Sequence, residues 1–228
     1  MHKTTIVFQG DSVTDAGRAK QISTIEITPP NGDLGTGYVS LIAAQLLRNN
    51  PHLEVYNRGI GGNRICDMYA RWKEHALNLQ PDLVSILNGI NDIGFEIRCG
   101  CGADREKYAF IYDRILYETL QAHPTCKLIL CQPFLLRCQC EHSMDIYNNW
   151  NIWHDEIVQR GLIVAELAKK YDAVFVPMGD ALDAVCQSAP AEFWSADCIH
   201  PTLAGHQVLA ECWLQAAADT LRDLSLSV

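Results

Sequence analysis

The run Thr4-Thr5-Ile6-Val7-Phe8, followed by Gln9-Gly10-Asp11-Ser12-Val13-Thr14-Asp15, decides the fold. The apolar run predicts a buried strand, and it stops at a glycine where polar, turn-forming residues begin. In open α/β sheets, ligands bind where such strands end. An ordinary Asx or serine turn has the same composition, because Gly, Asp and Ser are common turn residues. The rest of the chain has to decide between the two interpretations.

The composition is that of an ordinary globular protein. The chain has 228 residues, of which 48% are hydrophobic and 20% charged, and this predicts one domain over residues 1–228 with a sizeable core. The net charge of −9 argues against nucleic acid and against an anionic membrane surface as partners. No apolar stretch approaches the roughly 18 residues of a membrane span. Met1-His2-Lys3 leads into the first strand without a secretory signal, so we expect a cytoplasmic protein. Whether a leader was removed, and whether the chain forms a homo-oligomer, stays open.

The chain has ten cysteines but no Cys-x-x-Cys motif. Reduced thiols, several of them buried, are the expected state in the cytoplasm. Two Cys-x-Cys pairs occur, Cys99/Cys101 and Cys138/Cys140. Four thiols could bind zinc if both loops met, although this spacing is not itself a zinc signature. We expect no metal and no cofactor, and the redox state of these four thiols stays open.

Strand-like and helix-like segments alternate along the chain. Strands are predicted at residues 4–9, 53–57, 83–87, 127–131 and 173–177. Helices are predicted at residues 37–49, 67–79, 104–123, 144–170 and 202–224. Residues 18–33 and 94–102 are predicted to be loops. The alternation is typical of the α/β class, here a three-layer α/β/α, flavodoxin-like fold with a five-stranded parallel sheet of order 2-1-3-4-5.

Polar or glycine-rich clusters follow the first three predicted strands. Ser12 follows the first strand, residues 58–63 the second, and Asn88-Gly89-Ile90-Asn91-Asp92 the third. Because the carboxyl ends of parallel strands meet at one edge of a sheet, we expect these clusters to lie together. Their placement favours a functional Ser12 over a simple turn serine.

A serine nucleophile needs a base, and the base needs an orienting acid. Asp197 and His200 lie three residues apart before the last helix, and Pro201 keeps His200 out of a helical conformation. At this spacing the carboxylate can reach one ring nitrogen while the other faces outward. The alternative is that Asp197 caps a helix and that His200 is a structural histidine. His206 lies within the helix and is expected to pack or to lie at the surface.

Acyl transfer also needs hydrogen-bond donors for the developing oxyanion. The candidates are the backbone N–H of Ser12, a backbone N–H within Gly61-Gly62, and the side-chain amide of Asn91. A turn also explains each glycine or asparagine when it is considered alone. Turns do not explain why all of these residues occur together. Phosphate-loop, dinucleotide-binding, His-Glu-x-x-His and Gly-x-Ser-x-Gly motifs are absent from the sequence.

Together these residues resemble the SGNH hydrolases, also called the GDSL esterase/lipase family. Four blocks match in order, with Val13 where the family name has Leu: Gly10-Asp11-Ser12, Gly62, Gly89-Ile90-Asn91-Asp92 and Asp197-Cys198-Ile199-His200. The resemblance implies a hydrolase that cleaves esters through an acyl-enzyme. It implies Ser12 as nucleophile, His200 as base and Asp197 as its orienting acid. It assigns the oxyanion hole to Ser12, Gly62 and Asn91, with Gly61 as the alternative to Gly62.

The longer strings at residues 10–18, 34–39 and 85–92 are similar to a bacterial branch of acetylxylan esterases and other carbohydrate deacetylases. This similarity implies a serine esterase that acts on small acetyl esters of sugars or oligosaccharides. The alternatives are a lysophospholipase or thioesterase for longer acyl chains, and a non-catalytic binding module on the same fold. The sequence differs from that branch at Ile93-Gly94-Phe95, where the branch tends to carry a bulky pair of residues. Because this segment is expected to border the site, the difference bears on the identity of the substrate.

Three residues are candidates for the substrate pocket: Trp194, Phe134 and Arg58. Trp194 precedes Asp197 by three residues and could stack on a sugar or wall the acyl pocket. Phe134 follows the fourth strand, and Arg58 flanks the glycine-rich loop. Both aromatic residues are equally well explained by the core, and Arg58 is better explained by a structural role.

Overall fold

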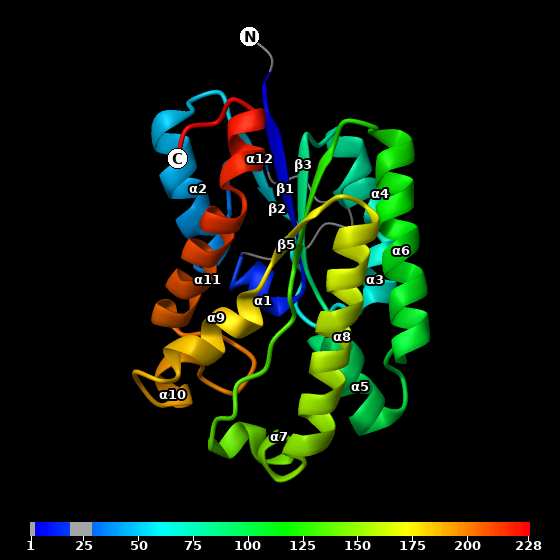
Figure 1. The fold of residues 1–228 in the computed structure, drawn as a ribbon, viewed down its shortest axis with the longest axis vertical. Coiled ribbons are helices and arrows are strands. Elements are labelled where there is room, and N and C mark those ends of the chain that lie inside the picture. The colour runs from blue at the N-terminus through cyan, green and yellow to red at the C-terminus, as the bar shows by residue number, and fades with distance from the viewer. Residues whose placement is uncertain (1–2, 19–28) are drawn as a thin grey trace.

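Five parallel strands form the centre of the molecule in the order β2-β1-β3-β4-β5 (Figure 1). The computed structural model describes residues 3–18 and 29–228. Its strands are β1 (Thr5–Gly10), β2 (Glu54–Asn57), β3 (Leu83–Leu87), β4 (Lys127–Cys131) and β5 (Val174–Val176). The predicted fold class and strand order are confirmed, whereas most of the predicted loop at 18–33 lies outside the described residues.

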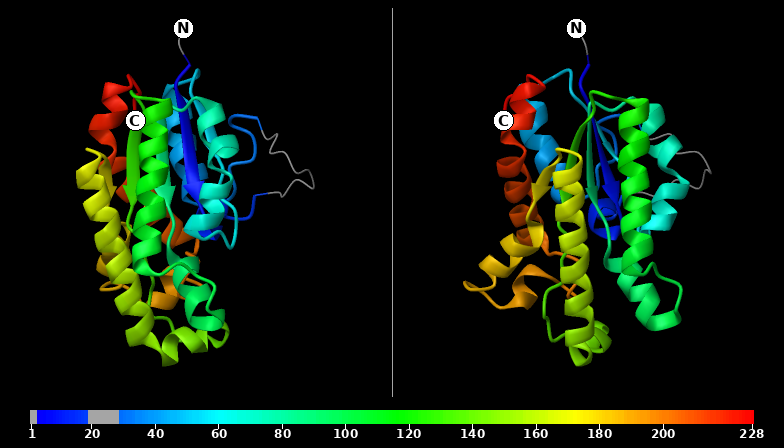
Figure 2. Two further views of the ribbon diagram at one scale, coloured as in Figure 1. Left: turned by 90° about the vertical axis from the view of Figure 1, so that its right-hand side faces the viewer. Right: turned by 45° about the vertical axis from the view of Figure 1, so that its right-hand side comes forward.

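Helices cover both faces of this sheet (Figure 2). One face carries α2 (Tyr38–Asn49), α9 (Met178–Val185), α11 (Leu203–Ala216) and α12 (Ala218–Asp223). The other carries α3 (Ile65–Ala70), α4 (Trp72–His75), α6 (Arg105–Ala122) and α8 (Trp150–Lys170). The shorter elements are α1 (Ser12–Asp15), η1 (Leu77–Leu79), α5 (Ile90–Cys99), η2 (Glu141–Ser143), α7 (Met144–Asn148) and α10 (Ala191–Trp194).

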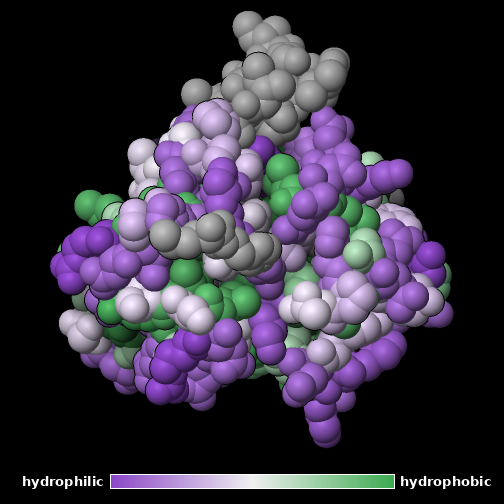
Figure 3. All heavy atoms as spheres, turned by 90° about the horizontal axis from the view of Figure 1, so that it is seen from above, coloured by the Kyte–Doolittle hydropathy of each residue, from purple (hydrophilic) through white to green (hydrophobic). Residues whose placement is uncertain are grey.

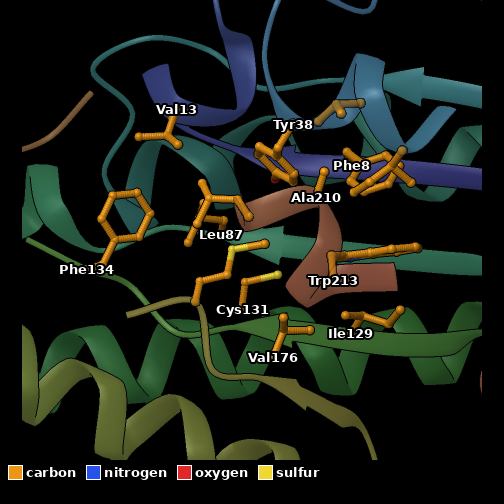
Figure 4. Close-up of a cluster of buried hydrophobic side chains, with 14 of the residues drawn as sticks. Phe8, Val13, Tyr38, Leu87, Ile129, Cys131, Phe134, Val176, Ala210 and Trp213 are labelled. Atoms are coloured by element: carbon orange, nitrogen blue, oxygen red, sulfur yellow. The ribbon is translucent and has the colours of Figure 1, made fainter. Parts of the chain in front are cut away.

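Each face of the sheet has its own hydrophobic core, because successive residues of a strand point to opposite faces. On the α2 and α11 face, Phe8 packs against Tyr38 and Trp213 (Figure 4). Val7, next to Phe8 in the chain, packs in the core on the other face. Trp213 is fully buried, and its Nε1 donates to Ser85 Oγ at 2.9 Å. The central strands are therefore covered on both sides.

Helix α5 is the main departure from the sequence prediction. The prediction of a loop over residues 94–102 is wrong, because the helix that begins at Ile90 continues to Cys99. A Cβ on Gly94 would lie only 3.3 Å from the Trp153 ring of α8. The missing side chain lets α5 pack closely against α8, and this packing outweighs the low helix propensity of glycine.

The remaining differences concern helix breaks. The predicted helices at 67–79, 144–170 and 202–224 each consist of two or more shorter pieces. Helices α9 and α10 were not predicted, because they are short and the sequence after β5 lacks a clear apolar period.

The end of the molecule from which β1 enters is mainly hydrophilic, with scattered apolar patches (Figure 3). Within residues 3–18 and 29–228, no helix combines the length and the apolar character needed to cross a lipid bilayer.

We expect Trp213→Ala to lower the free energy of unfolding by about 3–5 kcal/mol, because it leaves a cavity beside Phe8. Guanidinium unfolding followed by circular dichroism measures the change. Phe110→Ala is the matched control, since Phe110 is 71% exposed, and it should change stability by less than about 0.5 kcal/mol. Equal effects of the two substitutions would contradict this description of the core.

Candidate active site

The turn after β1 positions Ser12. A Cβ at Gly10 would lie 2.3 Å from the Leu87 carbonyl oxygen, so only glycine fits at this strand end. Asp11 then caps α1 by accepting the backbone N–H of Val13 at 3.0 Å. Ser12 is the first residue of α1, and its backbone N–H therefore has no acceptor within the helix. Both the hydroxyl and the N–H of Ser12 lie at the carboxyl edge of the sheet.

Ser12, His200 and Asp197 are linked by hydrogen bonds. Ser12 Oγ lies 2.8 Å from His200 Nε2, and His200 Nδ1 lies 2.6 Å from Asp197 Oδ2. Asp197 Oδ1 accepts the backbone N–H groups of Ile199 at 3.1 Å and His200 at 2.7 Å. In this arrangement a carboxylate orients an imidazole, and the imidazole can take a proton from a serine.

The Asp197 carboxylate and the protonated His200 ring stabilise each other. The hydrogen bond that the His200 ring donates to Asp197 raises the pKa of His200, and burial opposes this only in part. Burial alone would raise the pKa of Asp197, but the hydrogen bonds from the His200 ring and backbone outweigh it, so the Asp197 pKa is lowered. The pair thus favours an ionised Asp197. Because a free histidine has a pKa of about 6.5, His200 becomes neutral, and able to act as a base, only above that range.

The segment after β4 supports the turn that carries Asp197 and His200. Cys198 adopts a left-handed conformation, with φ of 72°. Its carbonyl accepts the backbone N–H of Leu136 at 2.9 Å. Ser143 Oγ donates to the Asp197 carbonyl at 2.5 Å. These contacts fix the turn relative to the sheet.

The loop after β2 brings two glycine N–H groups to the same edge of the sheet. Gly61 N–H donates to Asp15 Oδ2 at 3.0 Å. Gly62 has a φ of 83°, and among the described residues no protein group accepts its backbone N–H. Of the two candidates that the sequence left open, Gly62 is therefore the one with a donor available to a ligand.

Asn91 lies in the first turn of α5, next to this loop. Its Nδ2 donates to the Asn63 carbonyl at 3.3 Å, and Asn88 Nδ2 donates to the same oxygen at 3.0 Å. An amide nitrogen carries two hydrogens, so Asn91 keeps a second N–H for a ligand. The end of β3 and the glycine loop are thereby joined.

Sequence reasoning missed Arg71, which connects the Ser12 turn to the glycine loop. Its guanidinium donates to the carbonyls of Gly10 at 3.2 Å and Arg58 at 2.8 Å, and to Asn63 Oδ1 at 2.6 Å. Asp15, which holds Gly61, was missed as well. No local signal could have found either residue, because most of their partners lie far away in the sequence.

A cavity of about 10 Å³ is lined in part by Asp11 and Val13, the sequence neighbours of Ser12, whereas Ser12 itself does not line it. This volume is close to that of one water molecule. In Figure 4, Phe134 lies opposite Val13 and Leu87 at one end of the buried cluster. Phe134 is only 6% exposed, so it closes the cavity. The cavity is lined by Asp11, Val13, Leu87, Asn88, Ile90, Pro133, Phe134 and Ile199.

The two other pocket candidates do not line this cavity. The Trp194 ring packs edge-on against Phe193, and its Nε1 donates to the Ala189 carbonyl at 3.3 Å. Arg58 is 3% exposed, and its guanidinium lies over the Tyr56 ring. Of the three candidates, only Phe134 lines this cavity.

The remaining polar candidates have structural surroundings. His206 stacks on Tyr38 and accepts its backbone N–H at 3.2 Å, and burial lowers the His206 pKa to about 4. The two Cys-x-Cys pairs do not meet: Cys99 and Cys101 are exposed, whereas Cys138 is buried against the turn at 195–198. Among the residues that the structure describes, no group of three or more His, Cys, Asp or Glu side chains is arranged to hold a metal ion.

Ser12, His200 and Asp197 are thus hydrogen-bonded to one another at the carboxyl edge of a 2-1-3-4-5 parallel sheet, and this combination of fold and side chains is typical of hydrolases. The comparison with family models narrows the class, since residues 8–208 match the GDSL-like lipase/acylhydrolase family. The chain therefore belongs to this family and is a carboxylic ester hydrolase.

Individual relatives agree with the family assignment. An acetylxylan esterase from Geobacillus stearothermophilus is 32% identical over 214 residues, which cover 92% of each chain. The crystal structure of Axe2, an acetylxylan esterase from the same organism, has a TM-score of 0.79 at 28% identity and 93% coverage of both chains. LAE5, an α/β hydrolase from the metagenome of Lake Arreo, Spain, has a TM-score of 0.79 at 28% identity, covering 94% of this chain and 95% of its own.

We expect Asp197→Asn to move the acid limb of the kcat/KM profile to lower pH. The Asp197 carboxylate raises the His200 pKa, so its removal lets His200 lose its proton at lower pH. The rate should also fall by about 10³–10⁴-fold, because the imidazole is no longer held in the right tautomer. A pH series with p-nitrophenyl acetate measures both effects. Asp223→Asn, at an exposed site, is the control. An unchanged acid limb in Asp197→Asn would contradict this arrangement.

Proposed function

We propose that the protein is a serine esterase that removes acetyl groups from sugars or oligosaccharides. The observation that carries the proposal is the hydrogen-bonded chain from Ser12 Oγ through His200 to Asp197, at 2.8 and 2.6 Å. The acetyl substrate is inferred from the acetylxylan esterase relative.

In the proposed reaction, Ser12 Oγ attacks the ester carbonyl while His200 Nε2 takes the hydroxyl proton. Asp197 stabilises the imidazolium through its bond to Nδ1. The oxyanion is bound by the backbone N–H groups of Ser12 and Gly62 and by Asn91 Nδ2. His200 then gives the proton to the departing sugar hydroxyl, which leaves an acetyl-enzyme. A water molecule, deprotonated by His200, releases acetate and restores Ser12.

In this proposal the acyl group enters the small cavity that Val13 and Phe134 line. About 10 Å³ holds a methyl group, but a longer chain would meet Phe134. A cavity of about 540 Å³ lies between α5, α6 and α8 and shares no lining residue with the small one. The larger cavity is therefore not an extension of the small one. Hydrolysis of long acyl chains, the alternative interpretation of the sequence, has no comparable support.

We expect Ser12→Ala to lower the turnover of p-nitrophenyl acetate by at least about 10⁴-fold and to leave the fold unchanged. Acetate release from a panel of acetylated mono- and oligosaccharides tests the substrate class with the same pair of proteins. Ser40→Ala, on α2, serves as the serine control. Full activity in Ser12→Ala would refute the site. Activity on p-nitrophenyl acetate without acetate release from any sugar would refute the substrate class alone.

We expect Phe134→Ala to shift the preference from acetyl towards butyryl esters on the order of tenfold. The removed ring makes room for two more methylene groups, each worth about 0.8 kcal/mol when buried. The ratio of kcat/KM for p-nitrophenyl butyrate and acetate measures the shift. Phe193→Ala is the control, since Phe193 is 55% exposed and does not line the cavity. An unchanged ratio in Phe134→Ala would show that this cavity does not receive the acyl group.

A further inference from the structure

Two exposed thiols lie side by side where α5 ends. Cys99 is the last residue of the helix, Gly100 is its left-handed C-cap with φ of 63°, and Cys101 follows. The Sγ atoms of Cys99 and Cys101 are 3.3 Å apart. The left-handed turn at Gly100 brings the two side chains to the same side of the chain, a conformation that glycine adopts without strain.

These are the two exposed cysteines of the chain, and every other one is buried or half-buried. Burial raises the pKa of Cys126 and Cys131 to about 12. The hydrogen bond with Cys138 lowers the pKa of Cys198 to about 7, but Cys198 is fully buried and therefore has no access to a reagent in solution. Because the thiolate is the reactive form and needs access to its reagent, Cys99 and Cys101 are the thiols most open to chemistry in solution.

The backbone on both sides of the pair is anchored. Arg64 Nη1 donates to the Cys101 carbonyl, and Gly102 N–H donates to Glu96 Oε2 at 3.1 Å. A Cβ at Gly102 would lie 1.9 Å from the Asp92 carbonyl oxygen, so this part of the loop is seated tightly against α5. A backbone held in this way keeps the two sulfur atoms together, which lowers the entropic cost of joining them.

We propose that Cys99 and Cys101 form a dithiol site that small disulfides, such as oxidised glutathione, convert reversibly into a Cys99–Cys101 disulfide. The thiolate of one cysteine attacks the small disulfide, a protein–glutathione disulfide forms, and one glutathione leaves as its thiolate. The second cysteine then loses its proton to solvent and attacks the protein sulfur of the mixed disulfide, and the second glutathione leaves. Two electrons pass from the protein to the oxidant, which becomes two thiols.

The order of attack follows from the contact between the two thiols. The hydrogen bond with Cys101 raises the pKa of Cys99, so Cys99 holds its proton and Cys101 attacks first. A disulfide that is exposed and closes so short a loop belongs to the labile, readily reduced kind. The site should therefore respond reversibly to the glutathione redox state.

The protein is incubated in glutathione buffers with an increasing ratio of oxidised to reduced glutathione. The samples are quenched with acid and alkylated, and the masses of their peptides are measured by mass spectrometry. In wild type, the peptide with residues 99–101 should lose two hydrogens before any other cysteine reacts, and reduced glutathione should reverse the loss. Cys99→Ser should retain glutathione on Cys101 as a stable mixed disulfide. Cys101→Ser should retain glutathione on Cys99 in the same way, because no second thiol remains to displace it. Cys140→Ser, at a half-buried thiol, should behave as wild type.

Three outcomes overturn the proposal: a mixed disulfide that persists in the wild type, a disulfide from Cys101 to half-buried Cys66, or no reaction of either exposed thiol in the folded protein. Circular dichroism of each variant separates loss of the fold from loss of the chemistry. The readout is a mass and not a rate of ester hydrolysis, so the result is independent of the proposed esterase function.

Discussion

The parallel pairing of β1 between β2 and β3 is the constraint on which the site depends. Phe8 pairs in register with Asn57 of β2, and Gly10 pairs with Leu87 of β3. The three strands therefore end at one edge, and the chain leaves each of them with a polar or glycine-rich segment. Asn57 then binds across this edge, since its Nδ2 donates to the Thr14 carbonyl at 2.7 Å. Without this register, the residues proposed for catalysis would have no common location.

Buried polar groups, more than the hydrophobic core, hold the loops at that edge. Asp92 is fully buried, and both its carboxylate oxygens accept the backbone N–H of Ile65 at 3.1 Å. Burial raises the pKa of Asp92 to about 7. Asp15 and Arg71 hold the glycine loop in the same way. Donors that are fixed before substrate arrives need no reorganisation during the reaction, which is the main requirement of an oxyanion site.

The sequence predicted those parts of the fold that depend on local pattern. The apolar runs at β3 and β4 end where they were expected to end, because each is a continuous buried strand flanked by turn residues. Helix α5 was missed, because the close packing of Gly94 on Trp153 involves residues far apart in the chain.

The site shows the same difference between features that follow from local sequence pattern and features that depend on contacts between distant residues. Ser12, Asp197 and His200 were predicted from spacing and from family resemblance, and the structure brings them together. Arg71 and Asp15 were not predicted, because their roles exist only after the strands have paired. The pocket roles of Trp194 and Arg58 stay predictions; the structure gives Trp194 a hydrogen bond to the Ala189 carbonyl and places the Arg58 guanidinium over the Tyr56 ring.

We propose that Ser12 carries the acyl group during turnover. Rapid mixing with p-nitrophenyl acetate, followed by acid quenching within the first turnover and peptide mass spectrometry, detects this group. We expect one acetyl group, located on the hydroxyl of Ser12, that disappears as the reaction proceeds. An acetyl group on another side chain would contradict this proposal. The His200→Ala variant, in which deacylation is slowed, gives a second test: steady turnover without any acetyl group on Ser12 would also contradict it.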